Sequence, residues 1–125
     1  MNPTLPLQAY DVRAAACPAR EVLDHVTSRW GGLVLIVLQD GTLRFGELRD
    51  GVGGVSDKML SQTLRVLEHD GFVARHAYAE VPPRVEYSLT PLGREVASRL
   101  DALTEWIMAN MDRVQAARAE HGVKR

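Results

Sequence analysis

One stretch, residues 56–70, constrains the fold more than any other part of the sequence. Leu60, Leu64 and Leu67 repeat at the i, i+4, i+7 spacing of a helix with one apolar face. Ser56 stands where a helix N-cap belongs, and Gly71 suits the left-handed residue that ends a helix. The pattern predicts a helix that buries its leucines and exposes a polar face, made of Asp57, Lys58, Ser61, Gln62 and Arg65.

Two strand-like segments follow this helix. Residues 72–80 and 84–89 alternate in side-chain character, as half-buried strands do. Val81-Pro82-Pro83 separates them, and two prolines in succession favour a turn. We therefore predict a β-hairpin, with Arg84 beside its tip.

The sequence pattern before residue 56 is typical of short helices. Residues 1–7 read as a loose arm, residues 8–16 as a short helix, and Pro18 as the first turn of the next helix. The apolar run 33–39 fits a buried helix or a buried strand, and the helix is favoured because the following segment is too short to supply a strand partner. A short extended segment at 42–45 and a short helix from Phe45 lead into the glycine-rich loop 51–54.

A long helix is predicted after the hairpin, over residues 91–112. Thr90 is its N-cap and Pro91 its first residue. At about twenty residues it spans roughly 30 Å, more than a domain of this size needs for its own core. The part of the helix that the core does not need predicts a dimer interface. Its residues are Leu100, Leu103, Trp106, Ile107 and Met111.

The order of these elements predicts a winged helix-turn-helix. The class is α+β and mainly helical, with a two-stranded β wing and a long C-terminal dimerisation helix. We expect an N-terminal arm (1–16), the winged domain (17–112) and a polar, frayed tail (113–125). An α-helix fits the major groove of DNA, where the 56–65 side chains can address bases and phosphates. Arg44 and Arg49 flank the short helix, and for each a phosphate contact and a surface salt bridge are equally compatible with the sequence. For Arg84, a DNA contact and a brace for the hairpin are equally compatible with it.

The amino-acid composition neither indicates nor excludes a nucleic-acid partner. The chain of 125 residues has 15 basic and 16 acidic side chains, so positive charge must be local if DNA is bound. The single cysteine cannot form an internal disulfide, no signal peptide is visible, and the longest apolar run is too short to span a bilayer. These features predict a cytoplasmic protein without a membrane partner.

Several segments together resemble the HxlR family of MarR-like winged-helix regulators. The similarity is carried by Arg29-Trp30, by Leu43-Arg44-Phe45-Gly46-Glu47-Leu48-Arg49, by residues 56–64 and 67–73, and by the stretch from Glu80-Val81-Pro82-Pro83-Arg84 to Thr90. It covers about residues 17–111; Arg29 where lysine is common and the 51–54 loop are its departures. The resemblance implies a homodimeric transcription regulator without a cofactor, in which the terminal helices form the interface. Such a protein binds a palindromic operator on double-stranded DNA, here as a repressor, through Ser56, Lys58, Ser61, Gln62, Arg65, Arg84 and Arg44.

Cys17 has two interpretations. It precedes a predicted helix and lies near Arg13 and Arg20, and a helix N-terminus and positive charge both stabilise the reactive thiolate. Some HxlR-like regulators use a cysteine near this place to sense oxidants or electrophiles. The alternative is a small packing residue under the dimer interface.

Other function classes have less support. The four histidines are scattered, no metal-ligand spacing is present, and neither a nucleophile motif nor a phosphate-binding loop occurs, so we do not expect an enzyme. The alternative function is a winged-helix adaptor that binds protein without specific DNA binding. A small-molecule effector lying between the core and the long helix is compatible with DNA binding.

Overall fold

The helix predicted over residues 56–70 forms as α4 (Asp57–His69) in the computed structural model, which describes residues 10–122. Ser56 caps it, because its hydroxyl accepts a hydrogen bond from the Met59 N–H at 3.1 Å. The three leucines are buried, as their spacing predicted. Gly71 has φ +85°, and the next N–H, that of Phe72, donates to the Leu67 carbonyl at 2.9 Å and closes the helix.

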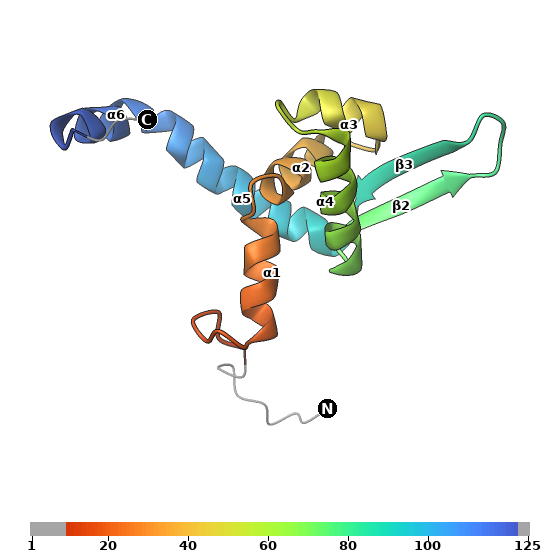
Figure 1. The fold of residues 1–125 in the computed structure, drawn as a ribbon, viewed down its shortest axis with the longest axis horizontal. Coiled ribbons are helices and arrows are strands. Elements are labelled where there is room, and N and C mark those ends of the chain that lie inside the picture. Colours follow the sequence, from red (N-terminus) through yellow and green to blue (C-terminus); the bar gives the residue numbers. More distant parts are fainter. Residues whose placement is uncertain (1–9, 123–125) are drawn as a thin grey trace.

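Three further helices pack around α4 from the N-terminal half. They are α1 (Pro18–Val26), α2 (Gly31–Val37), which a 3₁₀ turn η2 (Leu38–Asp40) extends, and α3 (Phe45–Gly51). The apolar run is therefore a helix, as predicted, and it places Val34, Leu35 and Leu38 in the core. This core sits at the junction of α1, α2, α4 and α5 in Figure 1.

The predicted two-stranded wing is present, and the short extended segment predicted at 42–45 pairs with it as a third strand. The hairpin strands β2 (Val73–Tyr78) and β3 (Arg84–Leu89) are joined by β1 (Leu43–Arg44), and the antiparallel order is β1-β3-β2. Leu43 pairs with Tyr87, a partner 44 positions away that periodicity within β1 could not reveal. Val73 and Leu89 are buried at the base, and from there the hairpin projects away from the helices (Figure 1).

The long C-terminal helix ends earlier than predicted. Helix α5 (Pro91–Ala109) begins at the Thr90 cap, whose hydroxyl accepts from the Gly93 N–H at 2.9 Å. It stops at Asn110, where the side-chain amide donates to the Trp106 carbonyl at 2.8 Å and competes with helical bonding. A separate helix, α6 (Met111–Glu120), follows, so the predicted boundary at residue 112 is wrong.

The polar tail was also expected to fray, and over residues 113–120 that expectation is wrong. Alanine, glutamine, arginine and glutamate all favour helix, and α6 is rich in them. Arg113 further donates to the Asn110 side-chain oxygen at 2.8 Å, which ties the first turn of α6 to the break. Helices α5 and α6 extend on the side of the molecule opposite the wing (Figure 1).

The predicted helix over residues 8–16 does not form in its described part, residues 10–16. This segment makes consecutive turns, in which the Ala14 N–H donates to the Asp11 carbonyl and the Cys17 N–H donates to the Ala14 carbonyl. Asp11 also accepts from the Arg13 N–H at 2.9 Å, and such a local side-chain bond offers the backbone an alternative to helix. The predicted loose arm, residues 1–7, lies outside the described residues. Within residues 10–122, no helix combines the length and apolar character needed to cross a membrane.

Candidate nucleic-acid interface

The polar face predicted for α4 is present on the outside of the helix. Ser56, Lys58, Gln62 and Arg65 are exposed. Ser61 is half-buried, and its hydroxyl accepts a hydrogen bond from Arg65 Nη1 at 3.2 Å. Lys58, Gln62 and Arg65 therefore lie on the accessible surface of α4, Ser56 precedes its first residue, and Ser61 orients Arg65.

An acidic side chain at the start of this face is matched by a basic one. Asp57, in the first turn of α4, accepts from Arg49 Nη1 of α3 at 3.1 Å. The hydrogen bond with Asp57 and its charge raise the pKa of Arg49 above its ordinary value. The contact joins α3 to α4 and offsets a negative charge that would otherwise repel phosphate.

Arg84 is held by the wing itself. Its guanidinium carbon lies 3.8 Å from the centre of the Tyr78 ring, and its nitrogens approach Glu80 and Glu86 at 3.7 and 3.8 Å. The Tyr78 hydroxyl donates to Glu86 at 3.0 Å, so the four side chains form one cluster on a face of the hairpin. These contacts favour the bracing interpretation of Arg84.

The hairpin tip is apolar and open. Val81 is 98% exposed, and Pro82 and Pro83 beside it are exposed too. The tip therefore presents apolar atoms, while the guanidinium of the nearest arginine, Arg84, lies over Tyr78 on the opposite strand.

Two arginines at the sheet remain exposed. Arg44, predicted from the sequence, lies opposite Glu86 in the β1–β3 pairing, and its backbone N–H donates to Glu47 at 2.8 Å, which starts α3. Arg75 on β2 was not predicted as a site residue. Neither forms an ion pair with a carboxylate anywhere in residues 10–122. The signal for Arg75 was its positive charge within a strand-like segment, which is weak because exposed strand positions are commonly charged.

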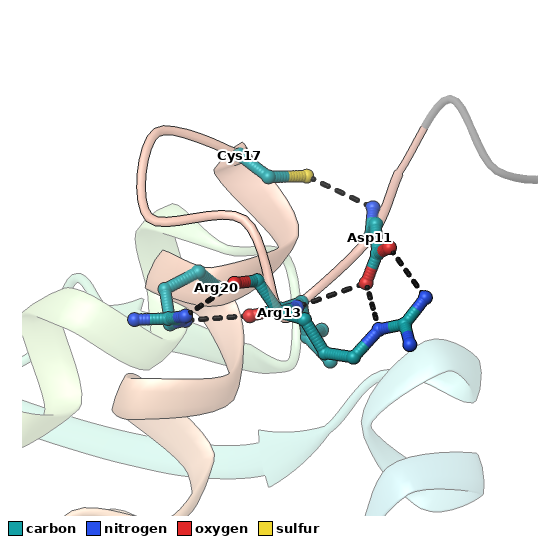
Figure 2. A network of polar contacts seen from close by, with 5 residues as sticks. Asp11, Arg13, Cys17 and Arg20 are labelled. Carbon is teal, nitrogen blue, oxygen red and sulfur yellow. Dashed lines mark hydrogen bonds and ion pairs between the residues drawn. The ribbon is translucent and has the colours of Figure 1, made fainter.

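Cys17 is half-buried at the N-cap of α1, where the Asp11 N–H points at its sulfur at 3.3 Å (Figure 2). The two nearby arginines do not contact the sulfur. Arg13 pairs with Asp11 at 2.9 Å, and Arg20 donates to the carbonyls of Val12 and Arg13. The Arg13 contact lowers the pKa of the Asp11 carboxyl. The electrostatic support expected from the arginines is thus replaced by a backbone N–H.

The predicted interface residues on the C-terminal helices divide into two groups. Leu103, Trp106 and Ile107 are 53, 57 and 40% exposed, and Met108 beside them is 68% exposed. Leu100 is half-buried against the core, and Met111 is half-buried at the start of α6. The exposed apolar surface is therefore concentrated in the last two turns of α5.

Across the part of the chain that the structure describes, no cluster of three or more histidine, cysteine or acidic side chains is arranged to hold a metal ion. The chemical groups that are gathered in space are instead the polar face of α4, the wing and the apolar end of α5.

Comparison with known proteins agrees with this arrangement. Residues 25–115 match the family model described as HxlR-like helix-turn-helix. The HTH-type transcriptional regulator YtfH of Escherichia coli (strain K12) is 58% identical over 107 residues, which cover 86% of this chain and 85% of that protein.

Solved structures show the same similarity. The structure of ytfH from Salmonella typhimurium has a TM-score of 0.84 at 55% identity and covers 88% of this chain and 98% of that one. The redox regulator HypR in its reduced form has a TM-score of 0.72 at 37% identity and covers 79% and 98% of the two chains. The resemblance inferred from the motifs and the winged fold are both confirmed, and these relatives are transcriptional regulators, not enzymes. The chain belongs to the HxlR-like helix-turn-helix family and is a DNA-binding transcriptional regulator.

Proposed function

We propose that the chain binds a palindromic operator as a homodimer and represses transcription from the promoter it covers. The observation that carries the proposal is the exposed face of Lys58, Gln62 and Arg65 on a helix whose first-turn acid is paired with Arg49. Arginine, lysine and glutamine on a groove-sized helix supply the contacts that read bases and hold phosphates. Arg44 and the wing would contact the flanking DNA backbone.

The dimer is supported by the apolar end of α5. Four large apolar side chains there are 40–68% exposed, and a patch of this kind marks an interaction surface. A second copy of the chain would cover it and set two α4 helices in successive major grooves, roughly 34–36 Å apart.

A gel-shift titration with the DNA upstream of the gene tests specific binding. We expect binding at least about 10³-fold tighter than to random DNA of the same length. Replacing Gln62 with Ala should relax sequence discrimination, whereas the matched control Gln115→Ala on α6 should not. Equal affinity for the upstream and the random DNA would favour a protein adaptor instead. Loss of expression from a reporter carrying the upstream promoter, when the gene for this protein is deleted, would exclude repression.

Cys17 is the second part of the proposal, as a thiol that controls DNA binding on oxidation or reaction with an electrophile. The Asp11 N–H lies 3.3 Å from Sγ, and Cys17 stands at the N-cap of α1, a position where reactive cysteines are commonly found. The similarity to HypR, a redox regulator by name, points the same way.

Diamide or a quinone should weaken operator binding by the wild-type protein and leave Cys17→Ser unaffected. Loss of binding by the treated serine variant would assign the sensitivity to another group.

A further inference from the structure

A cleft of about 190 Å³ lies between α1 and α4, next to the face assigned to DNA. Its apolar wall consists of Met59, Val66 and Leu67 from α4, and its rim carries Asp24, His25 and Gln62. Met59 and Val66 are 40 and 37% exposed, so apolar surface is presented inside a concave site. Ligand sites are commonly of this kind, with mostly apolar walls and a few polar groups.

Most polar groups around the cleft already have partners. His25 Nδ1 lies 2.6 Å from Asp70 Oδ2, which joins α1 to the C-terminal end of α4. Ser28 bonds the His25 carbonyl and the Gly31 N–H, and the Thr63 hydroxyl donates to the Met59 carbonyl. Within residues 10–122, the side chains of Asp24 and Gln62 make no hydrogen bond or ion pair.

The groups left for a ligand are thus one carboxylate, one amide and an apolar wall. A ligand that complements them has an apolar body and a positive charge. Its size is limited, since an enclosed apolar cavity of about 150 Å³ accommodates benzene.

We propose that the α1–α4 cleft binds a small aromatic or aliphatic ammonium compound, with the charge at Asp24 and the apolar body against Met59 and Val66. The effect on transcription rests on the function proposed above. Because Gln62 belongs to both the cleft and the DNA-facing surface, an occupied cleft removes it from base contact and lowers operator affinity.

Methyl-labelled methionine makes the site directly observable in the full-length protein by NMR. Met59 lies in the cleft, whereas Met108 and Met111 lie on the C-terminal helices. We expect benzylammonium to shift the Met59 methyl signal saturably, with a dissociation constant of about 1 mM, and to leave the Met108 and Met111 signals unchanged. Benzyl alcohol should bind more weakly and benzoate most weakly.

Asp24→Asn should weaken benzylammonium binding roughly two- to fivefold, the range for one exposed ion pair, and leave benzyl alcohol unaffected. Glu68→Gln, an exposed acid on α4 outside the cleft, is the matched control and should change neither. Absence of a saturable Met59 shift overturns the site, and equal affinity for the three probes overturns the cationic class.

These titrations contain no DNA, so their result on ligand binding does not depend on whether the protein binds an operator. The coupling is tested separately, by gel shift with saturating benzylammonium. Reduced operator affinity in the wild type, with the half-effective benzylammonium concentration raised roughly two- to fivefold in Asp24→Asn, supports it. Unchanged affinity with a filled cleft overturns it.

Discussion

Two basic side chains predicted to contact DNA, Lys58 and Arg84, differ in the ion pairs and aromatic contacts that they make within the protein. Lys58 on α4 is exposed and makes no ion pair in the described part of the chain, whereas Arg84 is stacked on Tyr78 and flanked by two glutamates. A guanidinium that is stacked on an aromatic ring and lies 3.7 and 3.8 Å from two carboxylates gains less from a phosphate than an unpaired ammonium does. The two positions should therefore contribute differently to DNA binding.

We expect Lys58→Gln to weaken binding to operator and random DNA alike. The slope of log K against log salt concentration should become shallower by about 0.9, the value for one phosphate contact. Arg84→Gln, which removes the same charge, is the comparison and should leave the slope unchanged. A shallower slope for the Arg84 variant would return that residue to the DNA interface.

The Tyr78 phenol reports on the same cluster in the wing. Its hydrogen bond to Glu86 favours the neutral phenol and raises the pKa of Tyr78 above 10.0. Because the folded-state value is the higher one, the contribution to stability is complete below the unfolded-state pKa and is lost as the pH rises through the folded-state pKa. The difference in phenolate absorbance between wild type and Tyr78→Phe should have its midpoint above pH 10, and Glu86→Gln should lower that midpoint.

Among the elements, the contact between α5 and the start of the wing depends on one glycine. A Cβ placed on Gly93 would lie 2.0 Å from the Phe72 carbonyl oxygen. The Thr90 hydroxyl also donates to the Gly71 carbonyl at 2.6 Å, so the beginning of α5 is fastened to the end of α4. Neither backbone can move away without loosening the base of the wing.

Gly93→Ala should therefore lower the free energy of unfolding by about 3 kcal/mol or more, the upper range for overpacking. Gly46→Ala is a matched control in α3, because its nearest neighbour is the flexible end of Arg49 at 3.6 Å. There we expect a gain of about 0.5 kcal/mol from the lower conformational freedom of alanine in the unfolded chain. Urea unfolding measures both, and equal midpoints for the two variants would contradict the packing argument.

At the scale of the whole molecule, the wing and the α5–α6 arm extend on opposite sides of the helical core (Figure 1). The apolar end of α5 therefore lies away from the wing, and a second copy can cover it while both α4 faces stay accessible. In the proposed dimer, assembly and DNA contact would therefore use separate surfaces.

Trp106→Glu should convert the dimer to a monomer at micromolar concentration, because an uncompensated carboxylate in an apolar interface is costly to desolvate. Val81→Glu places the same charge at the exposed wing tip and should leave the dimer intact. Sedimentation velocity distinguishes the two species. A Trp106→Glu protein that sediments as a dimer would locate the interface elsewhere.

The sequence by itself determined the elements whose signals are local. The leucine repeat, Ser56 and Gly71 define α4 within residues 56–71, and Thr90-Pro91 does the same for the start of α5. Periodicity and caps suffice there, because each depends on residues at most one or two turns apart. The motif spacing also identified the family.

Tertiary structure alone decided what depends on distant partners. The third strand exists because Leu43 meets Tyr87, and Arg84 is braced because the hairpin register places Tyr78 opposite it. The cleft between α1 and α4 exists because His25 and Asp70, 45 positions apart, join the two helices. No local pattern encodes such contacts, because they arise only when packing of the core has fixed how the elements cross.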